Sequence, residues 1–352
     1  MRVVVSGAGI GGLATALSLH AAGITDVTVY EAVEEIRPLG VGIGLLPDAV
    51  RELTELGLYD DLAEISVVIA EVAHHDRYGD RVSAAPAGLA AGGPAPRFAV
   101  HRGELQMLLL RAQLAWLGAE SLRTGLRLSG YAQTADGVTV EFTDRAGETV
   151  TDEADVLIAA DGIDSAGRAL MYPGEGPPSR SGVLQWRGVS PAPALLTGHT
   201  LITVGDAEQR FTAYPLRAAE GERPALLGWS AERPGSGASI EPADWTHPAE
   251  PDAILRHFTD WEFDWLDVPA VIANADVAYE YALVDRGPLP SWSDGRVTLL
   301  GDAAHPTPSA GTDGADGASR AISDARALAG ELAAHADPVE ALGAYEARRR
   351  GV

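Results

Sequence analysis

The residues best suited to chemistry begin with a glycine-rich turn close to the N-terminus. The segment Gly7-Ala8-Gly9-Ile10-Gly11-Gly12 has the spacing GxGxxG. In that spacing the first glycine permits a tight turn, the second lets a pyrophosphate approach the backbone, and the last lets a helix pack closely on a strand. Glu31 ends the next apolar stretch, where a carboxylate can accept hydrogen bonds from ribose hydroxyls. These residues predict a site for an adenine dinucleotide and leave both FAD and NAD open.

Two further aspartates each follow an apolar stretch. Asp161-Gly162 comes after residues 155–160, and Gly301-Asp302 comes after residues 297–300. A carboxylate such as that of Asp302 can bind a hydroxyl of a polyol chain. The alternatives are a tight turn at Asp161, a helix N-cap at Asp302 and an ordinary loop histidine at His305. Taken singly, neither segment decides between these alternatives.

Strands and helices must hold these residues in place. Residues 2–6 and 27–30 are rich in β-branched side chains and predict buried parallel strands, with a helix over residues 11–22 between them. This is the length and order of a βαβ unit. Further helices are predicted over residues 48–55, 59–64, 101–117, 318–334 and 338–350. Further strands are predicted over residues 126–131, 138–143, 148–153, 155–160 and 297–300.

The sequence changes character between Pro173 and Leu289. Trp and Tyr gather there, Pro recurs, and three stretches alternate as the strands of an antiparallel sheet would, namely residues 183–189, 200–204 and 225–230. We therefore expect a β-sheet domain inserted into a discontinuous α/β domain. The α/β domain would comprise residues 1–71, 99–182 and 283–352, and the inserted domain residues 72–98 and 183–282.

The composition excludes several chemistries. The chain has 352 residues, a net charge of −24 and no Lys or Cys, because all 26 basic residues are Arg. Without Lys there is no PLP anchor and no Walker A loop, and without Cys there is no thiol nucleophile and no thiolate metal site. The acidic balance disfavours nucleic acids and anionic membranes as partners. Glycines interrupt the first apolar stretch, which argues against a secretory signal, so we expect a cytoplasmic protein.

Together the three segments resemble those of the class A flavoprotein monooxygenases, the para-hydroxybenzoate hydroxylase-like family. That family carries GxGxxG at its N-terminus, an Asp-Gly motif in mid-chain and a Gly-Asp motif late, and the same order occurs here. The pattern is most similar to the phenazine-1-carboxylate and salicylate hydroxylase branch. Four more segments resemble family segments around the flavin: Pro38–Ile43, His101–Gln106, Trp186–Val189 and Val284–Pro290.

The resemblance implies an α/β fold with a Rossmann-like FAD-binding domain and an inserted antiparallel β-sheet substrate domain. It implies FAD bound tightly but non-covalently, NAD(P)H as a transient reductant and O2 as a co-substrate. Arg102 is expected at the pyrophosphate or ribityl chain, Gln106 near it, and Asp302 at a ribityl hydroxyl. Asp161 and Arg168 belong to a motif that serves both FAD and NAD(P)H in the family. The whole set expected at the cofactor is Gly7, Gly9, Gly11, Gly12, Glu31, Ala32, Gly42, Ile43, Arg102, Gln106, Asp161, Gly301, Asp302, Gly314, Gly317 and Ala318.

One stretch departs from the family pattern. The link between Gly301-Asp302 and the helix start at Gly314–Ser319 looks longer than usual, and Gly311–Gly314 offers a competing register. Asp316 stands where the family has a neutral amide, which would put a carboxylate near the flavin. Family members also commonly continue beyond the position that matches Val352.

The resemblance further implies hydroxylation of an aromatic or heteroaromatic ring through a flavin C4a-hydroperoxide, although relatives also perform epoxidation and Baeyer–Villiger insertion. No catalytic acid–base pair and no metal are required. The inserted sheet would face the flavin, and Arg187 could pair with a substrate carboxylate. The residues expected to line the substrate pocket are Arg187, Tyr214, Trp186 and Phe211. The alternative is that Trp186 and Phe211 are core residues and that Arg187 is a surface charge.

Other classes of function compete with this one. An NAD-dependent dehydrogenase would explain the glycine-rich turn alone. A flavin-dependent halogenase would need a Lys and a Trp-x-Trp-x-Ile-Pro segment, which the sequence lacks. A flavin-binding protein without turnover would use the same cofactor residues. For the monooxygenase we expect a monomer or homodimer whose partner is a small aromatic substrate.

Overall fold

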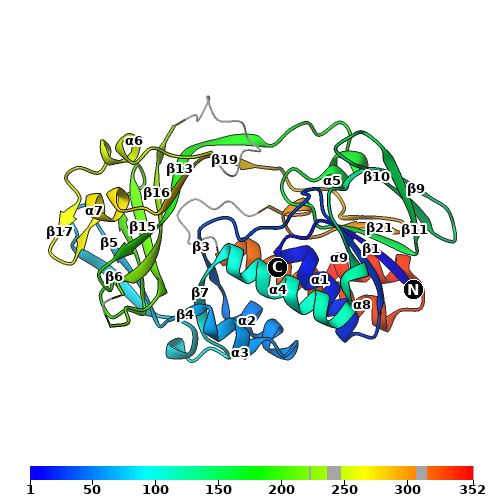
Figure 1. The fold of residues 1–352 in the computed structure, drawn as a ribbon, viewed down its shortest axis with the longest axis horizontal. Helices are drawn as coiled ribbons and strands as arrows, with labels where there is room; N and C mark the ends of the chain where they lie inside the picture. The colour runs from blue at the N-terminus through cyan, green and yellow to red at the C-terminus, as the bar shows by residue number, and fades with distance from the viewer. Residues whose placement is uncertain (222, 236–246, 307–314, 352) are drawn as a thin grey trace.

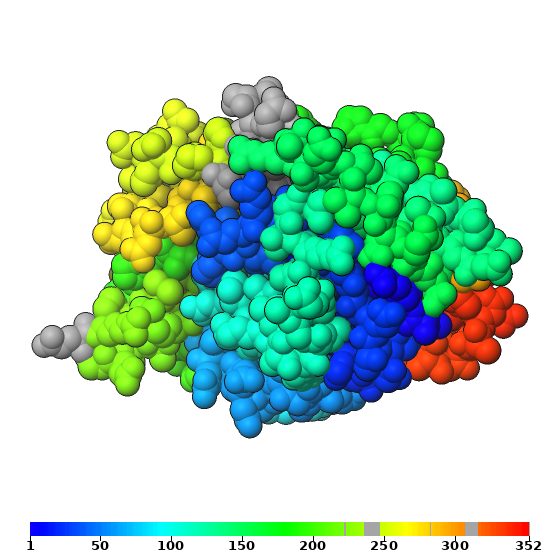
Figure 2. All heavy atoms as spheres, turned by 45° about the vertical axis from the view of Figure 1, so that its right-hand side comes forward, coloured from blue at the N-terminus to red at the C-terminus, as the bar shows by residue number. Residues whose placement is uncertain are grey.

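Two β-sheets of different size organise the chain into two lobes (Figure 1). The computed structural model describes residues 1–221, 223–235, 247–306 and 315–351. In Figure 1 the seven-stranded sheet lies on the left and the six-stranded sheet on the right, next to the N-terminus. The space-filling view puts the yellow segment around α6 (Pro251–Leu255) and the red C-terminal helices at opposite ends of the molecule (Figure 2).

The six-stranded sheet is built from short, buried apolar strands. They are β1 (Arg2–Ser6), β2 (Asp26–Tyr30), β8 (Leu122–Arg123), β12 (Val156–Ala159), β20 (Ser293–Asp294) and β21 (Val297–Leu299). The order is β20-β21-β12-β1-β2-β8, and every neighbouring pair is parallel except β20–β21. Parallel strands are covered on both faces and therefore need no polar alternation, which explains the continuous apolar run of β12. The predicted parallel strands are confirmed.

Helices and a small meander cover this sheet. Helix α1 (Ile10–Ala21) packs against α4 (Arg102–Leu117) and α8 (Ala315–Ala334), and α9 (Pro338–Arg349) packs on α8. The meander consists of β9 (Arg127–Gln133), β10 (Val138–Thr143) and β11 (Thr149–Ala154). It joins the sheet through Tyr30 and Phe142, whose rings stack 3.8 Å apart. The predicted meander is confirmed, as are the predicted helices, within two or three residues at their ends.

The seven-stranded sheet contains β5 (Glu71–His75), β6 (Arg81–Pro86), β13 (Ser179–Ala192), β14 (Thr200–Gly205), β15 (Arg210–Arg217), β16 (Ala225–Pro234) and β19 (Val277–Asp285). The order is β19-β13-β16-β15-β14-β5-β6. The expected antiparallel arrangement holds except for β14 and β5, which are parallel. β5 comes from a distant part of the chain, so no hairpin turn constrains its direction.

The two faces of this sheet pack against different partners. On the outer face, Trp229, Phe211 and Phe258 form a core with α6 and α7 (Val268–Ala273), which the sequence did not predict as helices. On the inner face, Val189, Tyr214 and their neighbours pack against a three-stranded sheet. That small sheet consists of β3 (Gly42–Leu45), β4 (Ser66–Ile69) and β7 (Arg97–His101), and it connects to α2 (Pro47–Glu55) and α3 (Tyr59–Glu64). It is the layer through which the two lobes meet.

Two long strands also connect the lobes. β13 and β19 pair over nearly their whole length, from Ser179 opposite Asp285 to Val189 opposite Val277. Figure 1 shows both strands running from the large sheet across the top of the molecule. Within the described part of the chain, no helix has the length and apolar character needed to cross a membrane.

Candidate functional site

The glycine-rich turn between β1 and α1 has the shape of a phosphate cradle. Gly7 has a φ of 103°, which favours glycine, and its N–H donates to the Tyr30 carbonyl at 2.7 Å. A Cβ on Gly12 would lie 1.8 Å from the Gly7 carbonyl oxygen, so α1 can begin here only with glycine. A Cβ on Gly9 would meet nothing within 4 Å. The space over Gly9 is therefore open at the N-terminus of α1, where a phosphate would bind.

Polar side chains hold the turn from both sides. The Glu31 carboxylate accepts hydrogen bonds from the N–H of Ala8 at 2.8 Å and of Val33 at 2.9 Å. The Gln106 side-chain amide, from α4, donates to the Ala8 carbonyl at 2.8 Å. Ala32 follows Glu31 and lines a recess of about 460 Å³ at the end of β2. Glu31 and Gln106 together therefore fix the backbone of the turn at Ala8.

The three signature segments lie against one another. A Cβ on Gly7 would lie 2.5 Å from the Ala160 carbonyl oxygen, at the end of β12. A Cβ on Gly11 would lie 3.1 Å from Leu300 Cδ2, at the end of β21. Because α1 approaches both strand ends this closely, the glycines of the first segment bring the second and third segments to the same edge of the sheet.

Asp161 acts as a helix cap. Its Oδ2 accepts hydrogen bonds from the N–H groups of Ala166 at 2.8 Å and Gly167 at 3.1 Å, at the start of α5 (Ala166–Met171). Its Oδ1 is buried and has no hydrogen-bond partner in the structure. Burial raises the pKa of the Asp161 carboxyl, and hydrogen bonds from Ser165 and the backbone oppose that shift. Asp161 therefore holds the turn at the end of β12, with one oxygen left for a further donor.

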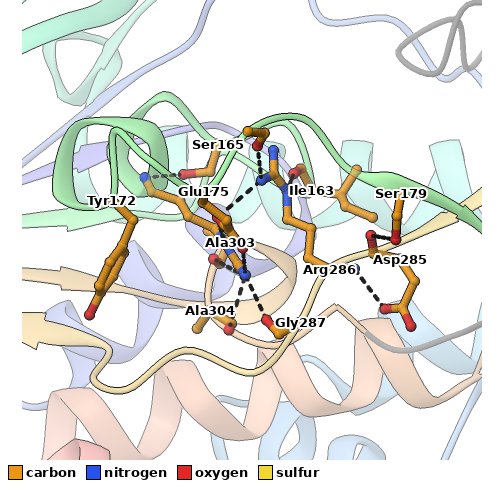
Figure 3. Close-up of polar contacts among 12 residues, drawn as sticks. Ile163, Ser165, Tyr172, Glu175, Ser179, Asp285, Arg286, Gly287, Ala303 and Ala304 are labelled. Atoms are coloured by element: carbon orange, nitrogen blue, oxygen red, sulfur yellow. Dashed lines mark hydrogen bonds and ion pairs between the residues drawn. The ribbon is translucent and has the colours of Figure 1, made fainter.

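Arg168 is fully buried and binds protein groups. Figure 3 labels four residues that accept its hydrogen bonds, namely Glu175, Gly287, Ala303 and Ala304. Its Nε donates to Glu175 Oε2 at 2.7 Å, and its Nη2 donates to Glu175 Oε1 and to the Gly287 carbonyl. Its Nη1 donates to the carbonyls of Ala303 and Ala304 at 3.2 and 3.3 Å. All three nitrogens are thus engaged within the protein. Arg168 joins the Asp161 segment to the residues that follow Asp302.

A second arginine completes this network. Arg286 Nη1 donates to Glu175 Oε2 and to the Gly176 carbonyl, each at 3.1 Å, and Arg286 Nε donates to the Ile163 carbonyl at 2.6 Å (Figure 3). The two guanidinium groups lower the pKa of the shared Glu175 carboxyl, Arg168 most strongly. No local pattern marks Glu175, because one of its two partners, Arg286, is 111 residues away along the chain.

Asp302 and Arg102 carry opposite charges that interact electrostatically. Both side chains are open to solvent, yet the surrounding protein desolvates them, which raises the pKa of the Asp302 carboxyl and lowers that of the Arg102 guanidinium. Arg102 interacts electrostatically with Asp302 and with Arg187 of the large sheet. Gly301 has a φ of 62°, a backbone turn that brings Asp302 to this position. Charged groups of both lobes therefore interact with one another here.

His305 anchors the end of the third segment. Its Nε2 lies 2.5 Å from Asp324 Oδ2, and its ring stacks on Trp292 at 4.6 Å. Asp324 also accepts from Arg349 Nε at 2.7 Å and from the Gly301 N–H at 3.3 Å. Asp324 was not among the residues predicted from the sequence. A carboxylate on the apolar face of a predicted helix nevertheless indicates a buried group that needs hydrogen-bond or charge partners.

Helix α8 begins beside this segment. Gly317 lies close to Asp302, because a Cβ on Gly317 would be 3.6 Å from Asp302 Oδ1. Ala318 packs against the main core, and Asp316 lies in the first turn. The Ser319 hydroxyl accepts from the Leu46 N–H at 2.9 Å, which ties α8 to the end of β3. Gly314 and the competing register at residues 311–314 lie outside the described residues.

Four residues were expected at the substrate, and they divide between the two faces of the large sheet. Arg187 and Tyr214 lie on the inner face, where Arg187 Nη2 and the Tyr214 hydroxyl both donate to the Gly42 carbonyl, at 2.9 and 2.6 Å. Trp186 and Phe211 belong to the buried core on the outer face. Successive residues of a strand point to opposite faces, which explains why Trp186 and Arg187 separate. Of the four residues, only the inner-face pair Arg187 and Tyr214 can therefore take part in the substrate site proposed below.

Gly42 and Ile43 lie in β3, between the two lobes. Gly42 pairs with His101 and Ile43 with Val100 across β7. The Arg102 N–H donates to the Val41 carbonyl at 2.9 Å. One small sheet thus carries Gly42 next to Arg187 and fixes the backbone of Arg102.

A dinucleotide cradle together with a second sheet that bears Arg187 fits a flavin-dependent oxygenase. The open space over Gly9 and the exposed, desolvated carboxylate of Asp302 fit the pyrophosphate and the polyol chain of FAD. The chain belongs to the FAD binding domain family, whose model matches residues 1–352.

Individual relatives agree with the family. The chain is 44% identical over 356 residues to a phenazine 1,6-dicarboxylic acid hydroxylase of Lysobacter antibioticus, covering 99% of this chain and 86% of that protein. It is 34% identical to a 3-amino-4-hydroxybenzoate 2-monooxygenase of Streptomyces platensis, covering 99% and 84%. Among solved structures, Klebsiella pneumoniae HpxO complexed with FAD and uric acid matches with a TM-score of 0.78 and 29% identity, covering 99% and 84%. The expected fold, the FAD cofactor and the class of FAD-dependent monooxygenase are confirmed, which sets aside the dehydrogenase and the halogenase.

Proposed function

We propose that this enzyme hydroxylates an aromatic or heteroaromatic carboxylic acid with a fused ring system, such as a phenazine carboxylate. The observation that carries the proposal is the guanidinium of Arg187, whose Nη2 binds the Gly42 carbonyl on the inner face of the large sheet. Desolvation by burial lowers the pKa of the Arg102 guanidinium most, and the charge of Arg187 lowers it further, so the two cations repel each other. Arg187 forms no ion pair within the described residues. An anionic group between these cations would relieve the repulsion.

The relatives support an acid as the substrate. The 44% identical relative is named for a phenazine dicarboxylic acid and the 34% identical one for an aminohydroxybenzoate. A planar guanidinium is suited to a carboxylate because it can donate two parallel hydrogen bonds. Arg187 is accordingly proposed as the group that binds the substrate acid, and Tyr214 as its inner-face neighbour.

The cofactor residues are proposed on the same basis. Gly7, Gly9, Gly11 and Gly12 would receive the pyrophosphate, Glu31 and Ala32 the adenosine, and Asp302 a ribityl hydroxyl. Arg102 and Gln106 would lie along the pyrophosphate and ribityl chain, and Gly42, Ile43, Gly317 and Ala318 around the ring. Asp161 and Gly301 would act through the backbone turns that they form. When bound, FAD accepts a hydride from NAD(P)H and activates O2 for transfer of one oxygen atom to the substrate.

The protein itself would bind, orient and exclude water. The inner face of the large sheet would hold the ring of the substrate while Arg187 fixes its direction. The positive ends of α1 and α8 and the charge of Arg102 would stabilise negative charge on the cofactor. We assign residues 1–71, 99–182 and 283–352 to cofactor binding and residues 72–98 and 183–282 to substrate binding. We also propose a cytoplasmic monomer or homodimer, because the cytoplasm supplies NAD(P)H.

The test uses the purified, FAD-loaded protein. NADH and NADPH oxidation would be followed with phenazine-1-carboxylate, phenazine-1,6-dicarboxylate and salicylate, and the products would be analysed by mass spectrometry under ¹⁸O2. We expect one ¹⁸O atom in the hydroxylated product of at least one phenazine acid. Flavin reduction without a labelled product from any of these acids would contradict the proposal and favour a flavoprotein without turnover.

A further inference from the structure

The carbonyl of Gly42 is a junction between the two lobes. It accepts a hydrogen bond from the Tyr214 hydroxyl at 2.6 Å and another from Arg187 Nη2 at 2.9 Å. Tyr214 comes from β15 and Arg187 from β13, whereas Gly42 begins β3. Two donors from the large sheet therefore use both lone pairs of one carbonyl oxygen in the small sheet.

The packing around this carbonyl leaves little freedom. The Tyr214 side chain is only 1% exposed. A Cβ on Gly42 would lie 2.6 Å from Tyr214 Cε2 and 2.9 Å from Leu216 Cδ2, so the ring lies directly against the glycine. Tyr214 is too enclosed to be an open wall of a pocket, and its hydroxyl is bound to the backbone.

One nitrogen of the Arg187 guanidinium is bound to the protein, and the other two have no hydrogen-bond partner among the described residues. Its Nη2 is bound to Gly42, and its Nε is buried without a hydrogen-bond partner. Nη1 forms no hydrogen bond or ion pair with any residue that the structure describes. The direction of the Gly42 carbonyl thus decides where the remaining N–H groups of the guanidinium point.

We propose that Tyr214 is a positioning residue for Arg187 and that it acts through the Gly42 carbonyl. The Tyr214 hydroxyl fixes the carbonyl, the carbonyl fixes Nη2 of Arg187, and the free edge of the guanidinium then faces the acidic group of the substrate. This inference rests on the proposed function, in which Arg187 binds a substrate carboxylate. In this role Tyr214 increases the preference of the site for charged over neutral ligands and does not contact the ligand itself.

The experiment measures this selectivity. FAD-loaded protein is titrated with phenazine-1-carboxylate and with its neutral amide, phenazine-1-carboxamide, and Kd is read from the change in flavin absorbance. Tyr214→Phe keeps the ring beside Gly42 and removes only the hydroxyl. We expect it to weaken binding of the carboxylate by about five-fold, the usual effect of one lost hydrogen bond, and binding of the amide by less than about two-fold.

Two further variants distinguish failure of the Tyr214 role from failure of acid recognition by Arg187. Arg187→Gln should weaken carboxylate binding by about ten-fold or more and leave amide binding nearly unchanged. Tyr172→Phe is the matched control, because the Tyr172 hydroxyl also donates to a carbonyl, that of Ser291 at 2.7 Å, but outside the large sheet. We expect the control to leave both Kd values unchanged.

The results separate the two proposals. If Arg187→Gln discriminates between the ligands but Tyr214→Phe weakens both equally or neither, Tyr214 does not act through Arg187, although acid recognition by Arg187 stands. If Arg187→Gln does not discriminate, acid recognition fails and the role of Tyr214 fails with it. Should Tyr214→Phe not yield folded protein, Gly42→Ala provides a second route. Its Cβ would displace the Tyr214 ring, and the same loss of selectivity is expected in the fraction that retains FAD.

Discussion

Arg168 and Glu175 form a two-pronged ion pair in which the guanidinium is fully buried and Nε lies 2.7 Å from Oε2. The same guanidinium donates to the carbonyls of Ala303 and Ala304, directly after Asp302. The carboxylate of Glu175 therefore compensates a charge whose other hydrogen bonds hold the backbone at the cofactor site.

Replacing Glu175 with Gln should destabilise the protein. The neutral amide would leave the Arg168 charge buried without a counter-ion, at a cost of about 3 kcal/mol. Arg168 lowers the pKa of Glu175, so the stability from this pair is present above the ordinary glutamate pKa and is lost as the pH falls through the lowered value. Urea unfolding of wild type and variant should therefore differ at pH 7 and converge in acid. Exposed Glu120→Gln is the control, and a Glu175→Gln curve that matches this control at pH 7 would argue against the role.

Asp302→Asn should weaken FAD binding and at the same time stabilise the apo protein. The asparagine loses a charged acceptor for a ribityl hydroxyl, so the ratio of FAD to protein after purification should fall. Burial raises the pKa of Asp302 in the folded protein, which means that wild-type stability decreases as the pH rises through that raised value. The apo variant should therefore melt at a higher temperature than apo wild type at pH 7, with the difference shrinking toward pH 4. A fully yellow variant would count against the ribityl contact, and a lower Tm at pH 7 would count against the electrostatic account.

Two glycines of the cradle should respond differently to alanine. Gly9→Ala places its Cβ in open space, so the apo protein should keep its melting temperature while FAD binding weakens by about ten-fold or more, because the methyl group occupies the phosphate position. Gly12→Ala places its Cβ 1.8 Å from the Gly7 carbonyl oxygen and should destabilise the fold by several kcal/mol. Thermal melting of the apo proteins and fluorescence titration with FAD measure the two effects. Equal behaviour of the two variants would contradict the geometry of the turn.

Substitutions of Arg187 and of Trp186, which are neighbours on β13, should have different effects. Arg187→Ala should raise KM for an acidic substrate and uncouple NAD(P)H oxidation from hydroxylation, while FAD stays bound. Trp186→Phe changes the outer-face core and should cost about 1–3 kcal/mol of stability with KM and coupling unchanged. Oxygen consumption, hydrogen peroxide release and product yield measure the coupling. A coupling defect in Trp186→Phe that equals that of Arg187→Ala would mean that the two faces of the sheet do not separate these roles.

Local patterns predicted much of the cofactor half from sequence. β1, the glycine-rich turn and Glu31 lie within one βαβ unit, so their spacing along the chain sets their spacing in the structure. Strand β10 was also predicted from local pattern, because its apolar residues Val138, Val140 and Phe142 alternate with polar ones and are buried on one side.

The contacts that position the site were less predictable because they join distant segments. The partners of Arg168 come from residues 175, 287, 303 and 304, and no local pattern marks them. Strand β15 is buried along almost its whole length, so it shows no alternation, and Pro215 argues against a strand there. Trp186 and Arg187 were both predicted to line the substrate pocket. Adjacent residues of a strand point to opposite faces, so the sequence alone already argues against that pairing.

The pairing of Ser179 with Asp285 has a consequence for engineering. The chain enters the large sheet at Ser179 and leaves it at Asp285, and these two residues are register partners joined by a 3.1 Å hydrogen bond from the Ser179 hydroxyl to the Asp285 carbonyl. The segment between them therefore starts and finishes at one place in the structure. Exchanging it, together with the β5–β6 hairpin, for the matching segment of a relative should transplant ring preference into an unchanged flavin module. A chimera that retains FAD and adopts the donor's substrate range would show that the two lobes can be recombined as separate parts.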